Sequence, residues 1–165
     1  VWNKSNAGMG SLYRSKHELV FVYRVGTAPH VNAVELGRHG RNRTNVWTYP
    51  GASAFGKDRA RDLADHPTVK PVALIADAIQ DCTARGDVVL DPFAGSGSTL
   101  LAAHHTGRVA HLIELDPLYV DVIIRRWLRE TGDPAVLADG GQSFDDVARD
   151  RAAEAARANR GGDDE

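Results

Sequence analysis

The sequence predicts an α/β protein whose parallel strands alternate with helices, and three observations support this fold class. Short apolar runs alternate with stretches of helical periodicity from His66 onward. A glycine-rich turn at residues 95–98 joins one such strand to the helix that follows it. The composition, 42% hydrophobic and 25% charged over 165 residues, is typical of one globular domain. We therefore expect a doubly wound parallel sheet with ligands at the carboxyl ends of its strands.

The first predicted helix follows the turn at residues 66–71. Val72, Ile75 and Ile79 recur there at helical spacing, and Gly86 is expected to end the helix. The later elements are predicted from wholly apolar runs for strands and from glycines or capping residues at helix ends. In chain order they are a strand over 88–90, a helix over 99–105 closed by Gly107, a strand over 109–113, a helix from Pro117, a strand over 135–138 and a helix from Ser143.

The helix that begins at Pro117 has the clearest signal. Asp116 is a favoured N-cap residue, and proline is favoured at the first helical position. Apolar residues then recur on one face, at Val120, Ile123, Ile124, Trp127 and Leu128. The last helix begins at Ser143 with Asp146 three residues later, the spacing of a capping box. Residues 161–165 are expected to fray.

The N-terminal part of the chain is predicted to hold a strand and a long loop. Leu19–Tyr23 is an apolar, β-branched run that predicts a buried strand. Residues 26–65 are rich in Gly, Asn, Arg, Ser and Pro, which predicts a loop interrupted by a short extended piece at Val46–Tyr49. The chain lacks an initiator Met and begins with strand-forming residues, so we expect it to be cut from a longer protein.

Composition and charge exclude several classes of protein. The single cysteine, Cys82, rules out an intrachain disulfide and a multi-cysteine metal site, and it favours the reducing cytoplasm. No apolar run approaches the roughly 18 residues that span a bilayer, and no signal-peptide pattern occurs. Residues 1–61 hold 10 basic and 3 acidic residues, whereas the remainder holds 10 and 19. This asymmetry favours a polyanionic partner for the N-terminal part, although solvated acidic faces would give the same counts.

The glycine turn and two acidic strand ends predict a nucleoside-binding site. Gly95 and Gly97 allow a close approach of the backbone, and Asp91 ends the preceding strand. Glu114 follows Gly95 by 19 residues, a spacing that suits a carboxylate on a ribose diol. Leu100 replaces the third glycine of a dinucleotide fingerprint, and no Gly-Lys-Ser/Thr phosphate loop occurs, so neither NAD nor ATP is favoured. Acidic strand ends suit a cationic ligand with free ribose hydroxyls, such as S-adenosylmethionine.

Two motifs in a fixed order make the chain similar to a known family. Residues 66–71 read His-Pro-Thr-Val-Lys-Pro, and residues 91–99 read Asp-Pro-Phe-Ala-Gly-Ser-Gly-Ser-Thr. With Glu114 and Tyr119 after them, these motifs resemble the amino-methylating DNA methyltransferases of the beta motif arrangement. Three N-terminal groups resemble the region that follows the family's catalytic half: Trp2-x-Lys4, Tyr13-Arg14-Ser15 and His17-Glu18. The resemblance covers nearly all of residues 1–144.

The resemblance implies a Rossmann-like fold with an incomplete sheet, S-adenosylmethionine as cofactor and double-stranded DNA as partner. The implied reaction is methylation of the exocyclic amino group of adenine or cytosine, as in restriction-modification systems. Glu114 would bind the ribose hydroxyls, and Thr68 and Lys70 would lie near the methionine moiety. The full implied cofactor-binding set is Thr68, Lys70, Asp91, Phe93, Gly95, Ser96, Gly97, Thr99 and Glu114. The alternatives are that Thr68 only starts a helix and that Phe93 belongs to the core.

A basic segment lies where the family places its target-recognition segment. Arg38, Arg41 and Arg43 are implied DNA contacts, because arginine forks suit phosphates and guanine edges; the alternative is a solvated loop. The expected organisation is residues 1–25 as the last strands of the catalytic half, 26–65 as the recognition loop, 66–142 as cofactor-binding strand–helix units, and 143–165 as a C-terminal helix with a frayed tail.

The family's catalytic loop, an Asp/Ser/Asn-Pro-Pro-aromatic sequence, is absent from the chain. Its seven prolines stand at positions 29, 50, 67, 71, 92, 117 and 134, and no two are adjacent. We therefore expect no catalytic residue here, no activity of the 165 residues alone, and a missing N-terminal catalytic half or second chain. A non-catalytic module that binds S-adenosylmethionine and DNA with a partner chain, and a nicotinamide-dependent oxidoreductase, are the alternatives. No metal is expected, because the ligand spacings are lacking.

Overall fold

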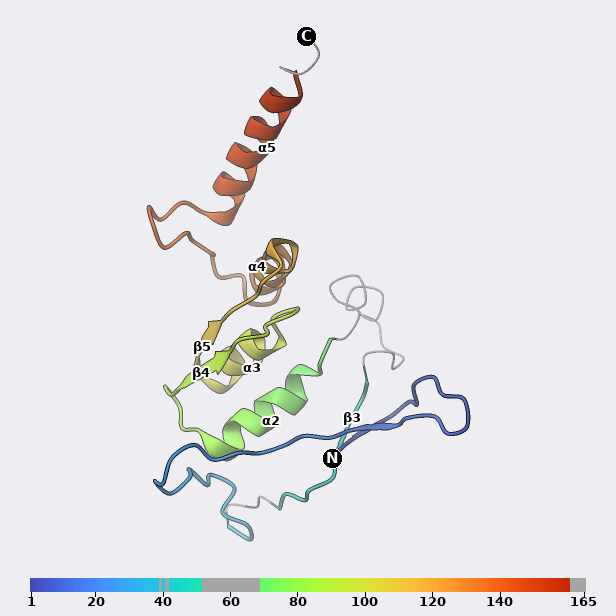
Figure 1. Ribbon diagram of the computed structural model, residues 1–165. Coiled ribbons are helices and arrows are strands. Elements are labelled where there is room, and N and C mark those ends of the chain that lie inside the picture. Colours follow the sequence, from blue (N-terminus) through green and yellow to red (C-terminus); the bar gives the residue numbers. More distant parts are fainter. Residues whose placement is uncertain (39, 41, 52–68, 161–165) are drawn as a thin grey trace. The chain divides into compact units, whose positions relative to one another are not determined.

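The computed structural model describes residues 1–38, 40, 42–51 and 69–160 (Figure 1). The chain divides into two compact units, Val1–Ile123 and Ile124–Glu165, and α4 contains the boundary between them. The elements are β1 (Trp2–Lys4), β2 (His17–Glu18), β3 (Trp47–Tyr49), α2 (Val72–Cys82), β4 (Val88–Asp91), α3 (Ser98–Thr106), β5 (Val109–Leu112), α4 (Pro117–Thr131) and α5 (Phe144–Arg160). Among the described residues, no helix is both long and apolar enough to cross a lipid bilayer.

The segment β4–α3–β5 is a parallel strand–helix–strand unit. β4 and β5 pair in parallel from Val88 opposite Val109 to Asp91 opposite Leu112. The strands lie side by side with α3 between them in the chain (Figure 1). The predicted strand, glycine turn, helix and second strand are therefore confirmed, and the turn where we expect a site lies at the carboxyl end of β4.

Two helices cover one face of this strand pair. Ile79 of α2 packs with Ala102 and Ala103 of α3, and Val89 and Ala110 pack against this cluster from the strands. The alanines allow α2 and α3 to approach closely, because they place no long side chain between the helices. The predicted apolar face of α2 is confirmed, since Val72 and Ile75 also pack there. The other face of the strands carries three exposed apolar side chains, Val88, Leu90 and Val109.

The helix ends largely follow the predicted signals. Gly107 closes α3 in the left-handed conformation, and Asp116 accepts a hydrogen bond from the Leu118 N–H at 2.9 Å at the start of α4. The Oγ of Ser143 accepts the N–H of Asp146 at 3.2 Å, which confirms the predicted cap of α5. The expected end of α2 at Gly86 is wrong: the helix ends at Cys82, because Thr83 has an extended backbone.

Two predicted strands are absent from the structure. Leu19–Tyr23 forms no ladder after β2 ends at Glu18, and its side chains are exposed, Val22 by 86%. This run pairs with no strand of the described residues, so its β propensity has no ladder to join. Residues 135–138 form only a single bridge, Val136 to Ser143, because the chain turns back at once through two glycines with positive φ, Gly140 and Gly141.

The N-terminal strands form a separate small sheet in the order β2-β1-β3. β1 pairs antiparallel to β2 and parallel to β3. Trp2 is its buried side chain, and its indole N–H donates to the carbonyl oxygen of Tyr49 at 3.1 Å. The short extended piece predicted at residues 46–49 is confirmed as β3.

Candidate cofactor site and nucleic-acid surface

Asp91 organises the turn that follows β4. Its Oδ1 accepts the N–H of Phe93 at 3.0 Å, and its Oδ2 accepts the hydroxyl of Thr99 at 2.6 Å. One carboxylate therefore joins the end of the strand, the turn and the first turn of α3. Hydrogen bonds to a charged acceptor are stronger than neutral ones, so Asp91 holds the turn in one geometry.

Gly97 satisfies two constraints at the start of α3. Its φ is +77°, in the left-handed region that other residues rarely adopt. A β-carbon at this position would lie 2.9 Å from Cγ2 of Ile123 on α4. The position therefore excludes side chains both by backbone conformation and by space. The sequence-predicted need for glycine in this turn has a direct physical cause here.

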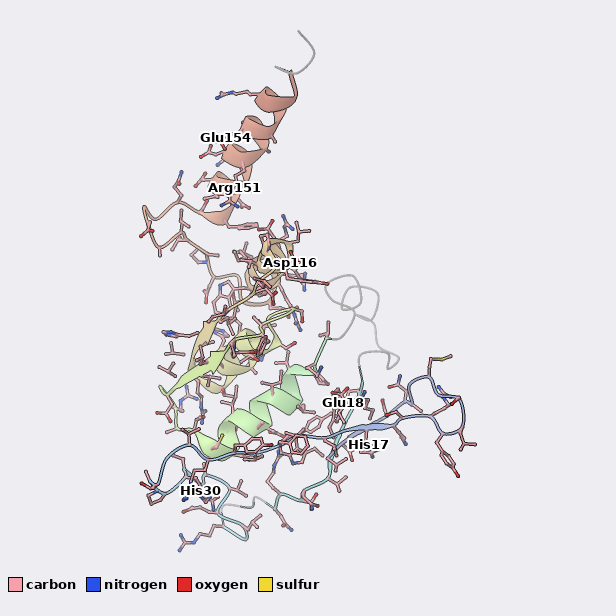
Figure 2. All side chains as sticks on the ribbon, in the orientation of Figure 1. His17, Glu18, His30, Asp116, Arg151 and Glu154 are labelled. Atoms are coloured by element: carbon pink, nitrogen blue, oxygen red, sulfur yellow. The ribbon has the colours of Figure 1, made fainter. Side chains whose placement is uncertain are left out.

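Glu114 links the two strand-end turns. Its Oε2 accepts the N–H of Gly95 at 2.7 Å, and its Oε1 accepts the N–H of Asp116 at 3.1 Å. Figure 2 marks Asp116 at the start of α4. Both carboxylate oxygens therefore hold backbone N–H groups, one in each turn.

Lys70 approaches the same turn from the segment before α2. Its carbonyl oxygen accepts the hydroxyl of Ser98 at 2.9 Å, which fixes that segment to α3. Its ammonium group lies 3.9 Å from the carboxylate of Glu18, and Glu18 also pairs with Lys4 at 2.6 Å. Glu18 lies on β2 (Figure 2), so this carboxylate joins the N-terminal sheet to the edge of the turn.

The turn after β4, the start of α3 and the segment around Lys70 enclose a cleft of about 140 Å³. It is lined by Lys70, Ile75, Asp91, Phe93, Ala94, Gly95, Ser96, Ser98 and Thr99. Cofactor sites typically enclose about 300–1,000 Å³, so the described residues fit as one wall of such a site. Phe93 lies at the rim of the cleft and is 87% exposed, so the alternative that it belongs to the core is wrong.

The structure brings together most of the predicted cofactor set. Gly97 and Glu114 are not lining residues, but they shape the turn that lines the cleft. Thr68 lies outside the described residues. Sequence reasoning missed Ile75 and Ser98 as lining residues. The sequence could have identified both residues, because Ser98 ends the glycine turn and Ile75 lies on the first turn of the adjacent helix.

The basic segment contains residues in two different situations. The side chain of Arg38 is 73% exposed and lies 3.6 Å from Glu35, so it is open to solvent. Arg43 is only 20% exposed and pairs with Asp77 and Asp81 of α2. Arg41 lies outside the described residues. The DNA contacts assigned to this segment remain predictions.

An apolar groove of about 420 Å³ runs along β4 on the side away from β5. Val20 and Trp47 line it from the N-terminal part, and α2 lines it with Leu74, Ala78 and other residues. β4 pairs only with β5 among the described strands, so its other edge has no ladder partner there. The described residues include no group of three or more His, Cys, Asp or Glu residues able to hold a metal ion.

Comparison with known proteins identifies the family. The family model of N6/N4 DNA methylases matches residues 1–125. The chain belongs to this family. The resemblance to amino-methylating DNA methyltransferases is thereby confirmed.

Individual relatives cover the chain only in part. The type II methyltransferase M.HinfI of Haemophilus influenzae is 32% identical over 146 residues, which are 79% of this chain and 38% of that protein. The type II methyltransferase M.ScaI of Streptomyces caespitosus is 37% identical over 87 residues, 53% of this chain and 29% of that protein. The solved PvuII DNA methyltransferase (cytosine-N4-specific) matches with 26% identity and a TM-score of 0.46, over 56% of this chain and 34% of that chain. The chain thus spans between 29% and 38% of these two curated relatives.

Proposed function

We propose that the chain binds S-adenosylmethionine and forms the cofactor half of a methyltransferase that modifies an exocyclic amino group of adenine or cytosine in double-stranded DNA. One observation carries the proposal: Glu114, at the end of β5, holds the glycine turn after β4 through Gly95. Asp91 lines the cleft and Glu114 binds Gly95 in its lining, and this arrangement in a member of a DNA methylase family supports the proposal. A place beside cellular DNA in the cytoplasm follows from the proposal.

The residues of the cleft match the chemical parts of this cofactor. When bound, S-adenosylmethionine supplies a methyl group on a positively charged sulfur. The carboxylates of Asp91 and Glu114 favour a cationic ligand and disfavour a pyrophosphate. Phe93 offers an exposed ring on which an adenine base can stack. Glu114 is a charged acceptor for the ribose hydroxyls, and its bonds to Gly95 and Asp116 fix its position.

The groove along β4 supports a second part of the proposal. We infer that a catalytic segment carrying the Pro-Pro-aromatic loop, from the same protein or from a second chain, completes the sheet there. The edge of β4 that has no ladder partner among the described strands supplies backbone donors and acceptors, and the apolar lining supplies buried area. The exposed run Leu19–Tyr23 lies beside this groove through Val20. Such a segment would also close the open side of the cofactor cleft.

Calorimetric titration of S-adenosylmethionine into the Glu114→Ala variant tests the cofactor assignment. We expect binding to weaken by about 1.5–3 kcal/mol, because a charged acceptor is removed from the hydroxyl bonds. Glu114→Gln should lose less, since its amide oxygen can still accept the Gly95 N–H. Glu154→Ala on α5 is the matched control and should bind as the parent does. An unchanged dissociation constant in Glu114→Ala would remove this residue from the site.

A non-catalytic module that acts with a partner chain is the second candidate, because a separate chain could equally pair with the edge of β4 that has no ladder partner among the described strands. The two candidates differ in where the catalytic loop is encoded. A Pro-Pro-aromatic loop in the same reading frame supports the methyltransferase proposal. A start codon at residue 1, together with co-purification of a separate methyltransferase subunit, supports the module.

A further inference from the structure

Arg43 is the centre of a polar cluster that joins the basic segment to α2. Its guanidinium lies 2.7 Å from Asp77 and 3.1 Å from Asp81. Tyr49 of β3 donates its hydroxyl to the same Asp77 oxygen and accepts from Arg43 at 3.4 Å. The guanidinium also lies 5.2 Å from the centre of the Trp47 ring. We call Arg43, Tyr49, Asp77 and Asp81 the Arg43 cluster.

The charge of this cluster is unsuited to a phosphate. One guanidinium faces two carboxylates, so the three groups together carry a net negative charge. The side chain of Arg43 is 20% exposed, compared with 73% for Arg38 in the same segment. A DNA phosphate would have to displace a carboxylate from a partly buried guanidinium, which costs the pairing already made. Arg38 meets a smaller cost, because its side chain is exposed and its ion pair with Glu35, at 3.6 Å, is also exposed.

The cluster also closes a loop. The N–H of Ala33 donates to the carbonyl oxygen of Asp81 at 3.0 Å, and Arg43 binds the carboxylate of the same residue. Ala33 and Arg43, which flank the basic segment in the sequence, are therefore both attached to Asp81 of α2. Arg38 and Arg41 lie between these two attachments. Closing a short loop removes conformational freedom that binding would otherwise have to remove.

The helix that receives this loop also belongs to the cofactor site. α2 carries Asp77 and Asp81 toward one end, and Ile75, nearer its other end, lines the cofactor cleft. Ile79 of the same helix packs on α3, which the glycine turn begins. The loop is thus attached to the element on which the cofactor site is built.

We infer that Arg43 is a positioning residue, which fixes the loop carrying Arg38 and Arg41 on α2 and makes no contact with DNA itself. The inference rests on the proposed function, because a loop that contacts DNA requires that the protein act on DNA. It separates two roles within one basic segment. Arg38 and Arg41 present charge to the phosphates, and Arg43 determines where that charge is presented.

The salt dependence of DNA affinity separates these roles. The test uses the complete methyltransferase, meaning this chain together with its catalytic segment. Arg38→Gln removes a phosphate contact and should reduce the log–log salt slope by up to about 0.9. Arg43→Gln should leave the slope unchanged while it weakens affinity by roughly tenfold, the cost of ordering a released loop. Its affinity for S-adenosylmethionine should stay at the parent value, and Arg43→Lys should recover part of the DNA affinity.

Removing the two carboxylates gives the opposite result. The double variant Asp77→Asn, Asp81→Asn frees the guanidinium, so the slope should steepen by up to about 0.9 as Arg43 reaches a phosphate. The double variant Asp133→Asn, Asp139→Asn makes the same change in net charge at exposed positions and is the matched control. The slope of this control should equal that of the parent.

Amide hydrogen exchange of residues 33–49 supplies a readout that needs no DNA. Exchange should accelerate in Arg43→Gln and in the Asp77, Asp81 double variant, and stay unchanged in Arg38→Gln. Unchanged exchange in Arg43→Gln, or a slope that flattens as much as in Arg38→Gln, would overturn the inference. A parent with no salt-dependent DNA binding would instead overturn the proposed function, and the exchange data would still decide whether Arg43 holds the loop.

Discussion

Residues 69–116 and residues 1–49 belong to one compact unit, yet they are stabilised in different ways. In the first region the strand-end carboxylates bind partners within the same strand–helix–strand unit and the turn that follows it: Asp91 binds Phe93 and Thr99, and Glu114 binds Gly95, 19 residues before it, and Asp116. In the second region the strands have three residues or fewer, and the loop before β3 is attached through Arg43 to carboxylates 34 and 38 residues away.

The two regions therefore differ in the source of their stabilising contacts. Residues 69–116 make these contacts within the region, whereas residues 1–49 depend on contacts with other elements. The turn after β4 has its own hydrogen bonds, its own glycine and a helix packed behind it. The run Leu19–Tyr23 has the composition of a buried strand but is exposed, and the groove beside it is apolar. An exposed apolar patch of this kind is the surface on which we propose that the catalytic segment docks. The candidate cofactor site, by contrast, is held by hydrogen bonds among the described residues.

The largest expected effect concerns the region that depends on other elements. The isolated 165 residues should transfer no methyl group from labelled S-adenosylmethionine to any DNA, because they contain no catalytic loop. They should also self-associate through the free edge of β4 and the apolar groove. Methyl transfer and sedimentation are measured on the same preparation. Transfer by a pure monomer would show that the catalytic residues are within this chain.

The next effect tests whether the glycine turn is as constrained as its geometry indicates. Gly97→Ala should lower the free energy of unfolding by about 2–4 kcal/mol, from left-handed strain plus the contact with Ile123. Gly86→Ala is the matched control: its φ is +88°, but no atom lies within 4 Å of the added carbon. Its cost should be only about 1–2 kcal/mol. Equal costs in urea titrations would show that the approach of Ile123 adds nothing.

The sequence was informative where structure depends on neighbouring residues. The Asp116-Pro117 start, the glycine turn and the apolar face of α2 all depend on residues within a few positions, and all were predicted. Leu19–Tyr23 and residues 135–138 were wrongly predicted as strands, because a strand also needs a partner at the right place. Asp77 and Asp81 stand four residues apart and therefore share one face of α2, but no local pattern pairs them with Arg43.

The smallest expected effect concerns the hydrogen bond from Tyr49 of β3 to Asp77 of α2 and its dependence on pH. Burial and the hydrogen bond to Asp77 raise the pKa of Tyr49 above its usual value of 10. A raised folded-state pKa means that the stabilisation is complete below the unfolded-state pKa near 10 and is lost as the pH rises through the folded-state value. Tyr49→Phe should therefore lower the free energy of unfolding by about 1 kcal/mol at pH 7, the worth of one hydrogen bond.

The difference between the parent and Tyr49→Phe should shrink above pH 10, because a tyrosinate facing Asp77 is repelled by it and no longer donates. Tyr13→Phe is the matched control, since Tyr13 is 86% exposed, and it should follow the parent at every pH. Urea titrations between pH 7 and pH 11 give the free energy of unfolding of each variant and of the parent. Subtracting the parent value at each pH removes the contribution of other titrating groups. A constant difference across this range would show that the hydroxyl of Tyr49 contributes to packing alone, and the loop before β3 would then depend on Arg43 without help from β3.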